Sequence, residues 1–489
     1  MKVNRKFLKY YTVFVFGLTI IPYVLVKIPP FSDYIGHLYF SFYSGGANDP
    51  YTHQFHLSYQ FIDTLLTLIR MVFQTPARTS VVFFVLNNIL MISIFYLFLK
   101  ILEFNKKIIL PFIFLYPLGQ FSVSYYWGLI PFVTSSMFWA LFILLYLNRQ
   151  EKTITFKFFI ILAFIEFITF FSHPLSSLFM ILALFVFFLK AIINKEKNNI
   201  VYLILFAIEV VYLSFIFKMS LPSRFGNASI TSIFINKDLF SVILTRFNYA
   251  ISNLNTKDFP KLSGVSILPA TLLSLIKTLG YLSSFILILI SFKKFSIKSS
   301  RFYLVLIIFI LNVIYFFVVD RYDQASMLPI RVLDYYEIMR FGGLLYLISL
   351  IMGKNLTKFL ANHTRSISML FGLVSLFFVY SLIHQAGNIH KLVVSTVVQT
   401  IRCTEKERNK EKVLYNYDLK YDAWFKRAIA VAATLNIELK NKKIVIRNEW
   451  ADACTHCPLV WNNSFDTNRS VGRRLKFDYN KDLVRVSCK

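Results

Sequence analysis

Long apolar runs recur along this chain from its N-terminus to about residue 382, and polar connections separate them. Apolar runs with few charges predict transmembrane helices when they can cross about 30 Å of hydrocarbon at about 1.5 Å per residue. We predict about eleven spans; the runs 108–118 and 341–353 are short, and are either extended by their neighbours or broken helices that line a cavity. The other predicted spans are 10–28, 79–101, 128–147, 155–171, 175–193, 200–218, 271–292, 302–319 and 367–385. Residues 1–386 are thus expected to form an all-α polytopic membrane domain in contact with the lipid bilayer.

Basic residues fall on alternate connections, and this distribution predicts the orientation of the spans. Residues 2–9 carry four Lys or Arg before the first span, whereas the connections 29–60, 119–127 and 172–177 carry none. Because short cytoplasmic loops keep an excess of Lys and Arg, we expect the N-terminus in the cytoplasm. An odd number of spans in the cell (inner) membrane then places the C-terminal segment outside. No small-residue cleavage site follows the first run, so we expect a retained span and no removed signal peptide.

The overall charge does not change this picture. The chain has 489 residues, is 56% hydrophobic with a mean hydropathy of +0.58, and carries a formal net charge of +28. A strongly basic chain can bind nucleic acid. Here, however, the basic residues form short clusters between apolar runs, as the orientation of a membrane protein requires. We therefore expect no nucleic-acid partner.

The chain changes character after residue 386, where charged residues become frequent and long apolar runs are few. Residues 422–435 have the pattern of a helix, and residues 443–448 and 483–488 alternate like strands. We predict that residues 387–489 form a small α/β extracytoplasmic domain.

All four cysteines lie in this C-terminal segment, at Cys403, Cys454, Cys457 and Cys488. An even number of cysteines confined to an exported segment favours two disulfides. The Cys-Thr-His-Cys sequence at 454–457 is also compatible with a zinc site or a redox pair, and these alternatives stay open.

The first predicted outer loop, residues 29–78, contains the clearest catalytic candidates. Asp33 and His37 are four residues apart and share a face if this stretch is helical. A carboxylate beside an imidazole can hold a divalent metal, or act as a base with its orienting partner. The alternative is a solvated loop in which Asp33 only caps a helix.

The same loop contains further polar residues and an amphipathic stretch. Asp49 and His53 are candidate substrate ligands, and three of the eight histidines fall between residues 37 and 56. Over residues 61–73, apolar side chains recur at helical spacing with polar ones between them. This pattern predicts an interfacial helix on the outer leaflet.

Two shorter outer turns add candidate substrate contacts. Trp127 lies in an aromatic and polar turn, and His173 lies between the spans 155–171 and 175–193. The alternatives are an ordinary interfacial belt of aromatic residues and a histidine whose ring is satisfied by a backbone carbonyl.

Arg321, Arg331 and Arg340 lie in the predicted outer connection 320–342, against the orientation bias of the other loops. Arginine binds phosphate through a planar fork of donors, so the (pyro)phosphate headgroup of a polyprenyl lipid is the expected ligand. The alternative is pairing with the acidic residues of the same connection.

The first outer loop resembles that of one branch of the bacterial polytopic glycosyltransferases of the GT-C fold class. That branch has the pattern Pro-Pro-x-x-Asp-Tyr-Pro-Asn-His-Leu-Ala-Arg, and the matching residues here are Pro29, Pro30, Asp33, Tyr34, His37 and Leu38. The departures are Ile35, Gly36 and Phe40, the last of which replaces the arginine. The turns at Trp127 and His173 follow in the same order as in that branch, so the resemblance covers about the first 200 residues.

This resemblance implies a membrane enzyme that transfers a sugar from a polyprenyl-phosphate donor to a glycan, lipid or protein acceptor on the outer face. It implies that Asp33 is the general base or helps to hold a divalent metal, with His37 orienting Asp33 or sharing that metal. The rivals are a polysaccharide polymerase or ligase, a flippase for lipid-linked saccharides, and a non-catalytic assembly protein that acts through residues 387–489. A flippase would bury charges at mid-membrane, where the candidates Glu166 and Glu209 are few.

Overall fold

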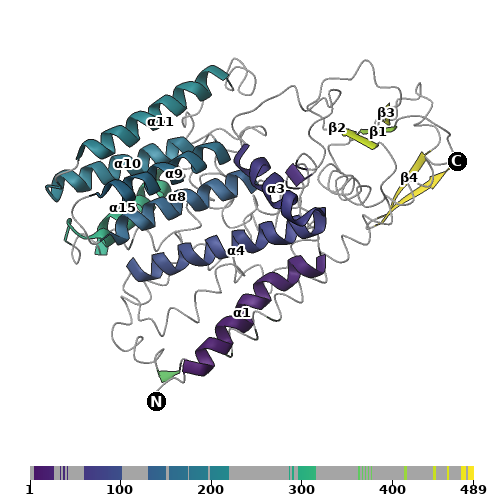
Figure 1. Ribbon diagram of the computed structural model, residues 1–489, viewed down its shortest axis with the longest axis horizontal. Coiled ribbons are helices and arrows are strands. Elements are labelled where there is room, and N and C mark those ends of the chain that lie inside the picture. The colour runs from purple at the N-terminus through teal and green to yellow at the C-terminus, as the bar shows by residue number, and fades with distance from the viewer. Residues whose placement is uncertain are drawn as a thin grey trace.

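The computed structural model shows a mainly helical protein (Figure 1). The residues that it describes are 5–26, 34, 37, 38, 41, 60–101, 130–149, 154–173, 176–196, 199–219, 286, 289, 290, 296–314, 362, 363, 366, 369, 373, 376, 412–415, 444–447, 460–461, 475–480 and 483–488.

The described helices fall where the hydrophobic pattern predicts spans, and at residues 61–73, where it predicts an interfacial helix. Three of them are long and apolar enough to cross a membrane, over Ala77–Ile101, Ile130–Asn148 and Ser176–Ile193. The helices are α1 (Arg5–Val26), α3 (Gln60–Phe73), α4 (Pro76–Ile101), α8 (Ile130–Asn148), α9 (Phe156–Ser172), α10 (Ser176–Ile193), α11 (Asn199–Met219) and α15 (Ser300–Val313). The predicted spans outside the described residues, apart from isolated positions, are 108–118, 271–292, 341–353 and 367–385.

Local sequence signals set several helix ends. The Thr155 side chain caps α9 by accepting a hydrogen bond from the Phe158 N–H, and Ser299 caps α15 in the same way. Gln74, directly after α3, adopts a left-handed conformation with φ of 57°. Pro76 then begins α4, where its fixed φ suits the first helical turn. The connection between α3 and α4 is therefore tight.

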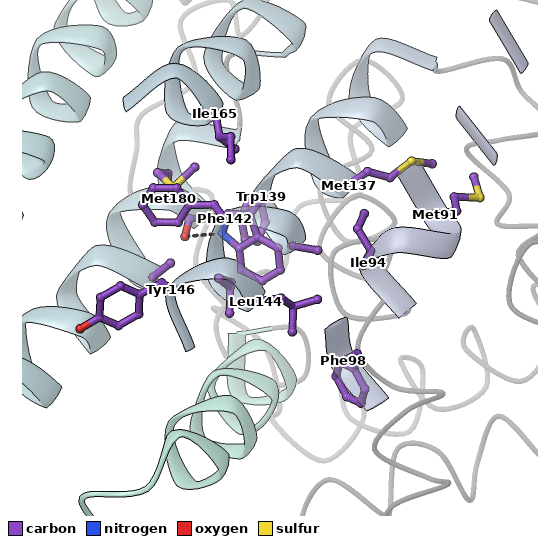
Figure 2. Packing of buried hydrophobic residues seen from close by; sticks show 14 of the residues in the cluster. Met91, Ile94, Phe98, Met137, Trp139, Phe142, Leu144, Tyr146, Ile165 and Met180 are labelled. Carbon is purple, nitrogen blue, oxygen red and sulfur yellow. Dashed lines mark hydrogen bonds between the residues drawn. The ribbon is translucent and has the colours of Figure 1, made fainter. Parts of the chain in front are cut away.

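Helix α8 lies at the centre of the bundle, which explains why its sequence is apolar on every side. It contacts α3, α4, α9, α10 and α15. The side chain of Trp139 is fully buried, and Figure 2 shows it among side chains from α4, α8, α9 and α10. Its Nε1 donates a hydrogen bond of 2.9 Å to the carbonyl of Phe179 in α10. The one polar atom of this large side chain is thus satisfied within the core.

The outward faces of the helices are apolar as well. Phe164 of α9 is 61% exposed and Ile200 of α11 is 68% exposed. On the opposite side of α8, α1 packs on α4 through a stacked pair of rings, Tyr23 and Phe84, whose centroids are 4.6 Å apart. Helices that are apolar both inside and outside the bundle suit a lipid environment, in which exposed hydrocarbon carries no penalty.

Two small sheets are described in the C-terminal segment. Strands β1 (Lys412–Tyr415), β2 (Ile444–Arg447) and β3 (Val460–Trp461) form a parallel sheet in the order β2–β1–β3. Strands β4 (Leu475–Asn480) and β5 (Leu483–Cys488) pair antiparallel, with Leu475 opposite Cys488. The predicted strands at 443–448 and 483–488 are confirmed as β2 and β5. The predicted helix at 422–435 lies outside the described residues, as do Cys403, Cys454 and Cys457.

Candidate functional site

Packing of its neighbours fixes the position of His37. Tyr34, His37, Leu38 and Ser41 are helical, and helical spacing places Tyr34, Leu38 and Ser41 on one face, where all three are buried. The Tyr34 ring lies 4.8 Å from that of Phe84 in α4, centroid to centroid. Burial raises the pKa of the Tyr34 phenol, so this residue stays neutral and serves as an anchor.

The imidazole of His37 forms a close pair with a carboxylate from a different element. Its Nδ1 lies 2.7 Å from Oδ1 of Asp63, in the first turn of α3. The side chains are 17% and 37% exposed, respectively, so water and a solute can reach the pair. When Nδ1–H donates to Asp63, Nε2 is the basic nitrogen of the ring. Asp63 favours the tautomer whose basic nitrogen is Nε2, and it is through the basic nitrogen that an imidazole accepts a proton or binds a metal.

A second contact ties the His37 segment to α3. The guanidinium of Arg70, in the last turn of α3, donates a hydrogen bond from Nη1 to the backbone carbonyl of Ser41. Arg70 follows Asp63 by two helical turns, so the polar face of α3 contacts the His37 segment at two points, through Asp63 and through Arg70. The His37–Asp63 geometry is therefore supported by packing on α4 and by polar contacts to α3.

Helix α3 differs in one respect from the sequence-based expectation. The prediction of a helix is confirmed, but its apolar residues Ile62, Leu66 and Ile69 pack into the protein core, while Val72 is 71% exposed. The apolar stripe of α3 therefore packs against the core, and not against the lipid surface alone.

Sequence reasoning missed Asp63 as a candidate site residue. The signal was its place on the polar face of this amphipathic stretch, one turn before Thr67 and two turns before Arg70.

His173 lies at the turn between α9 and α10. Its backbone N–H donates to the Thr169 carbonyl over 3.2 Å, and its carbonyl accepts from the Ser176 N–H over 3.1 Å. The ring is 3% exposed and meets the ring of Phe132 edge to face at 5.0 Å. The structure therefore places His173 in the packing of this turn, and its role as a substrate ligand stays a prediction.

The remaining candidates lie outside the described residues: Asp33, Asp49, His53, Trp127, Arg321, Arg331 and Arg340. The structure brings His37 together with Asp63, which was not among the predicted site residues. Across the described ranges, no group of three or more His, Cys, Asp or Glu side chains is placed to hold a metal ion. His37 and Asp63 supply one nitrogen and one carboxylate, which are fewer ligands than a metal site requires.

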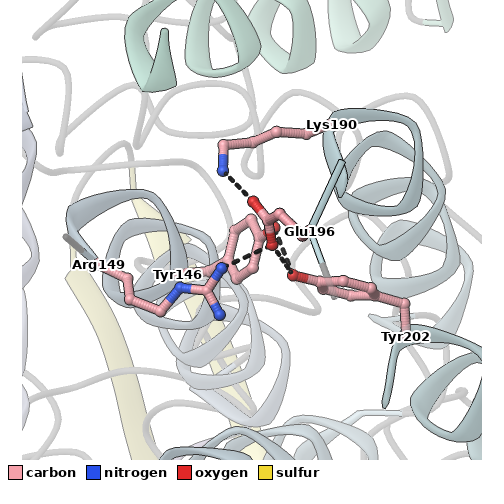
Figure 3. Close-up of polar contacts among 5 residues, drawn as sticks. All are labelled: Tyr146, Arg149, Lys190, Glu196 and Tyr202. Atoms are coloured by element: carbon pink, nitrogen blue, oxygen red, sulfur yellow. Dashed lines mark hydrogen bonds and ion pairs between the residues drawn. The ribbon is translucent and has the colours of Figure 1, made fainter. Parts of the chain in front are cut away.

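A second polar cluster, around Glu196, joins residues at the ends of α8 and α10 and at the start of α11 (Figure 3). Glu196 Oε2 accepts hydrogen bonds from Arg149 Nη2 over 2.7 Å and from the Tyr202 hydroxyl over 2.9 Å. Its Oε1 accepts from Lys190 Nζ over 3.0 Å. The cations of Arg149 and Lys190 lie 5.1 Å and 5.0 Å from the ring centroid of Tyr146. We name Tyr146, Arg149, Lys190, Glu196 and Tyr202 the Glu196 cluster.

The backbone at the end of α10 places Glu196 in this cluster. The Glu196 N–H bonds the Ala191 carbonyl and the Lys195 N–H bonds the Ile192 carbonyl, with Lys195 left-handed at φ of 52°. This is a Schellman motif, which turns the chain back over the last helical turn. The Glu196 carboxylate thereby comes within hydrogen-bond distance of Lys190, six residues earlier in the sequence.

The electrostatics of the Glu196 cluster favour a structural role. Burial opposes the negative charge of Glu196, but the hydrogen bonds and charges of Lys190, Tyr202 and Arg149 outweigh it and lower the pKa of the carboxyl. Both carboxylate oxygens are occupied, so the cluster has no carboxylate left for catalysis. It ties the ends of α8 and α10 to the start of α11.

Comparison with known proteins finds no relative: no protein-family model, no curated protein and no solved structure matches this chain.

Proposed function

We propose that this chain is an integral membrane glycosyltransferase that moves a sugar from a polyprenyl-phosphate donor to a glycan, lipid or protein acceptor on the outer face. The observation that supports this proposal most is the partly exposed pair of His37 and Asp63, 2.7 Å apart, in a protein with helices apolar enough to cross a membrane. An imidazole held by a carboxylate is a common arrangement for moving a proton. The resemblance of residues 29–40 to GT-C enzymes supplies the reaction class.

Each residue has a defined role in this reaction. Asp33, four residues before His37 in the sequence, takes the proton of the acceptor hydroxyl. The acceptor oxygen attacks the anomeric carbon, and the bond from that carbon to the phosphate oxygen breaks with its electron pair left on the phosphate. Arg321, Arg331 and Arg340 stabilise the departing lipid phosphate. His37, positioned by Asp63, orients Asp33.

A divalent metal would fit the same residues. Because Nδ1 of His37 pairs with Asp63, a metal here would bind through the other ring nitrogen, Nε2, and Asp33 would be the second ligand. A ligating histidine commonly donates its other N–H to a carboxylate. When bound, such a metal would contribute positive charge beside the phosphate of the donor.

The test is the substitution Asp33→Asn in purified protein in nanodiscs. Asparagine caps a helix about as well as aspartate, so protein abundance should hold. If Asp33 is the base, consumption of glucosyl- or mannosyl-phospholipid falls by about 10²–10⁴-fold. Thr64→Ala, at an exposed position of α3, is the matched control and should keep full activity. Near-normal turnover of Asp33→Asn would remove the catalytic assignment.

The second candidate is a polysaccharide polymerase or ligase, or a flippase for lipid-linked saccharides. One observation favours the flippase: Glu166 and Glu209 are both fully buried within helices α9 and α11. Transporters place ionisable groups inside the membrane in this way. A flippase would move the lipid-linked sugar across a vesicle membrane without consuming it, whereas a transferase would consume it.

The orientation and the C-terminal region belong to the same proposal. The active site requires residues 29–78 on the outer face of the inner membrane, with the N-terminus in the cytoplasm. Residues 387–489 then form an extracytoplasmic α/β domain, in which a parallel pair such as β1 and β2 needs a crossover connection. The predicted helix 422–435 lies between these two strands in sequence and suits that crossover.

A further inference from the structure

Two carboxylates meet inside the helix bundle, remote in sequence from the His37–Asp63 pair. Glu166 of α9 and Glu209 of α11 are 0% exposed, and the two helices are in contact. The two side chains interact with each other, and Glu209 also interacts with the hydroxyl of Ser177 in α10. Glu166 lies about 15 Å along α9 from its first residue, and Glu209 about 15 Å along α11, at about 1.5 Å per residue. The pair is thus deep within both helices.

Their polar atoms lack hydrogen-bond partners. In the described part of the chain, none of the four carboxylate oxygens of Glu166 and Glu209 has a partner of hydrogen-bond geometry, and neither does the Ser177 hydroxyl, which is also 0% exposed. A buried polar group without a partner is unfavourable by about 1–3 kcal/mol, and more if it is charged. Three fully buried polar side chains without such a partner therefore point to a species that satisfies them.

The Glu166–Glu209 pair differs from the Glu196 cluster in its lack of hydrogen-bond partners and positive charges among the described residues. Glu196 is also buried, yet it receives donors from Arg149, Lys190 and Tyr202. In the part of the chain that the structure describes, the groups that interact with the Glu166–Glu209 pair are the Ser177 hydroxyl and the Tyr212 phenol, and neither carries a positive charge. Two adjacent ionised carboxylates in such a site would repel each other strongly, with nothing to offset the loss of water.

We propose that Glu166, Glu209 and Ser177 form a proton-binding site within the helix bundle, in which the two carboxyl groups share one proton. The protonated carboxyl donates to its ionised partner, a strong charge-assisted hydrogen bond. The Ser177 hydroxyl donates to the remaining charge on Glu209. The site holds one negative charge in place of two, as paired carboxylates elsewhere do. Gain or loss of the proton changes the attraction between α9 and α11, and so links the packing of these helices to pH.

Dicyclohexylcarbodiimide tests the site, because it reacts with protonated carboxyl groups in apolar surroundings. In the full-length protein in nanodiscs at neutral pH, mass spectrometry should locate the adduct on Glu166 or Glu209 and not on Glu196. Labelling should decline as the pH rises. In Glu166→Gln the neighbouring carboxyl is gone, so the labelling of Glu209 should depend on pH differently from its labelling in the wild type. Thr64→Ala, at an exposed position of α3, is the control and should leave the labelling of the pair unchanged.

Three results would overturn the proposal. One is no adduct on either residue. Another is labelling of Glu209 that is the same in Glu166→Gln as in the wild type, since the two groups would then titrate independently. The third is protection by Na⁺ at fixed pH, which would assign the site to a metal cation. If Glu166→Gln yields no folded protein, infrared pH titration of the wild type decides: a protonated carboxyl band at neutral pH supports the site, and its absence refutes it.

Discussion

At the scale of single residues, Asp63 is the most informative position. It lies 26 residues after His37 in the sequence, yet its carboxylate pairs with the His37 imidazole over 2.7 Å. A residue that acts through another should alter the pH dependence of the reaction as well as its rate. A residue that only supports the fold should lower the amount of folded protein instead.

We therefore predict the outcome of Asp63→Asn. The amide keeps the size of the side chain but removes the charge that favours one imidazole tautomer. The transfer rate should fall by about 10–100-fold, as for other groups that orient a functional histidine. The pH–rate profile should shift along with it, while Thr64→Ala on the same helix changes neither. An unaltered profile in Asp63→Asn would assign this residue to folding alone.

Glu196 permits a prediction of stability against pH. Its pKa is lowered in the folded protein, so its contribution is present above the unfolded-state value of about 4.3 and is lost as the pH falls through the lower, folded-state value. Glu196→Gln removes the charge at every pH and leaves Arg149 and Lys190 buried without their carboxylate. We expect a loss of about 3–5 kcal/mol at neutral pH. Thermal melts across pH should show a smaller acid-dependent loss in the variant than in the wild type; equal losses would contradict this account.

At the scale of elements, the end of α10 carries a local strain that can be removed. Lys195 is exposed and left-handed, with φ of 52°, a conformation that glycine adopts without steric penalty. Lys195→Gly removes the steric cost of the left-handed conformation, but it also gives the unfolded chain more conformational freedom. The net effect should be a stabilisation of up to about 1 kcal/mol. Gln74→Gly, at φ of 57° after α3, is the parallel case. A lower melting temperature in both variants would show that the side chains outweigh the backbone.

At the scale of the whole molecule, the orientation is the property to test. The basic residues 2–9 and the neutral outer connections predict a cytoplasmic N-terminus and an external C-terminus. After reduction, an impermeant thiol reagent should label Cys403, Cys454, Cys457 or Cys488 in intact cells. Without reduction the labelling should be much weaker, because two disulfides are predicted. Labelling that requires broken cells would reverse the orientation and remove the case for disulfides.

The sequence by itself determined the elements that depend on local pattern. The structure has helices long and apolar enough to cross a membrane at the predicted spans 79–101, 128–147 and 175–193. It also has a helix at 61–73 and a strand at 483–488, where periodicity predicts them. These signals are local, because an apolar run or a repeat of about 3.6 or two residues is visible within a short window. The residue pattern of the first predicted outer loop likewise indicates His37 as a candidate site residue.

Only the tertiary structure decided which side chains meet. His37 and Asp63 are 26 positions apart in sequence, and Arg149 and Glu196 are 47 apart. Glu166 and Glu209 are isolated acids in apolar runs, and nothing in either run indicates that the two face each other. The rotation of each helix about its own axis depends on packing across the whole bundle, above all around α8. Contacts of this kind lie outside any local window, so the pairs that carry the chemistry emerge only when the helices are packed together.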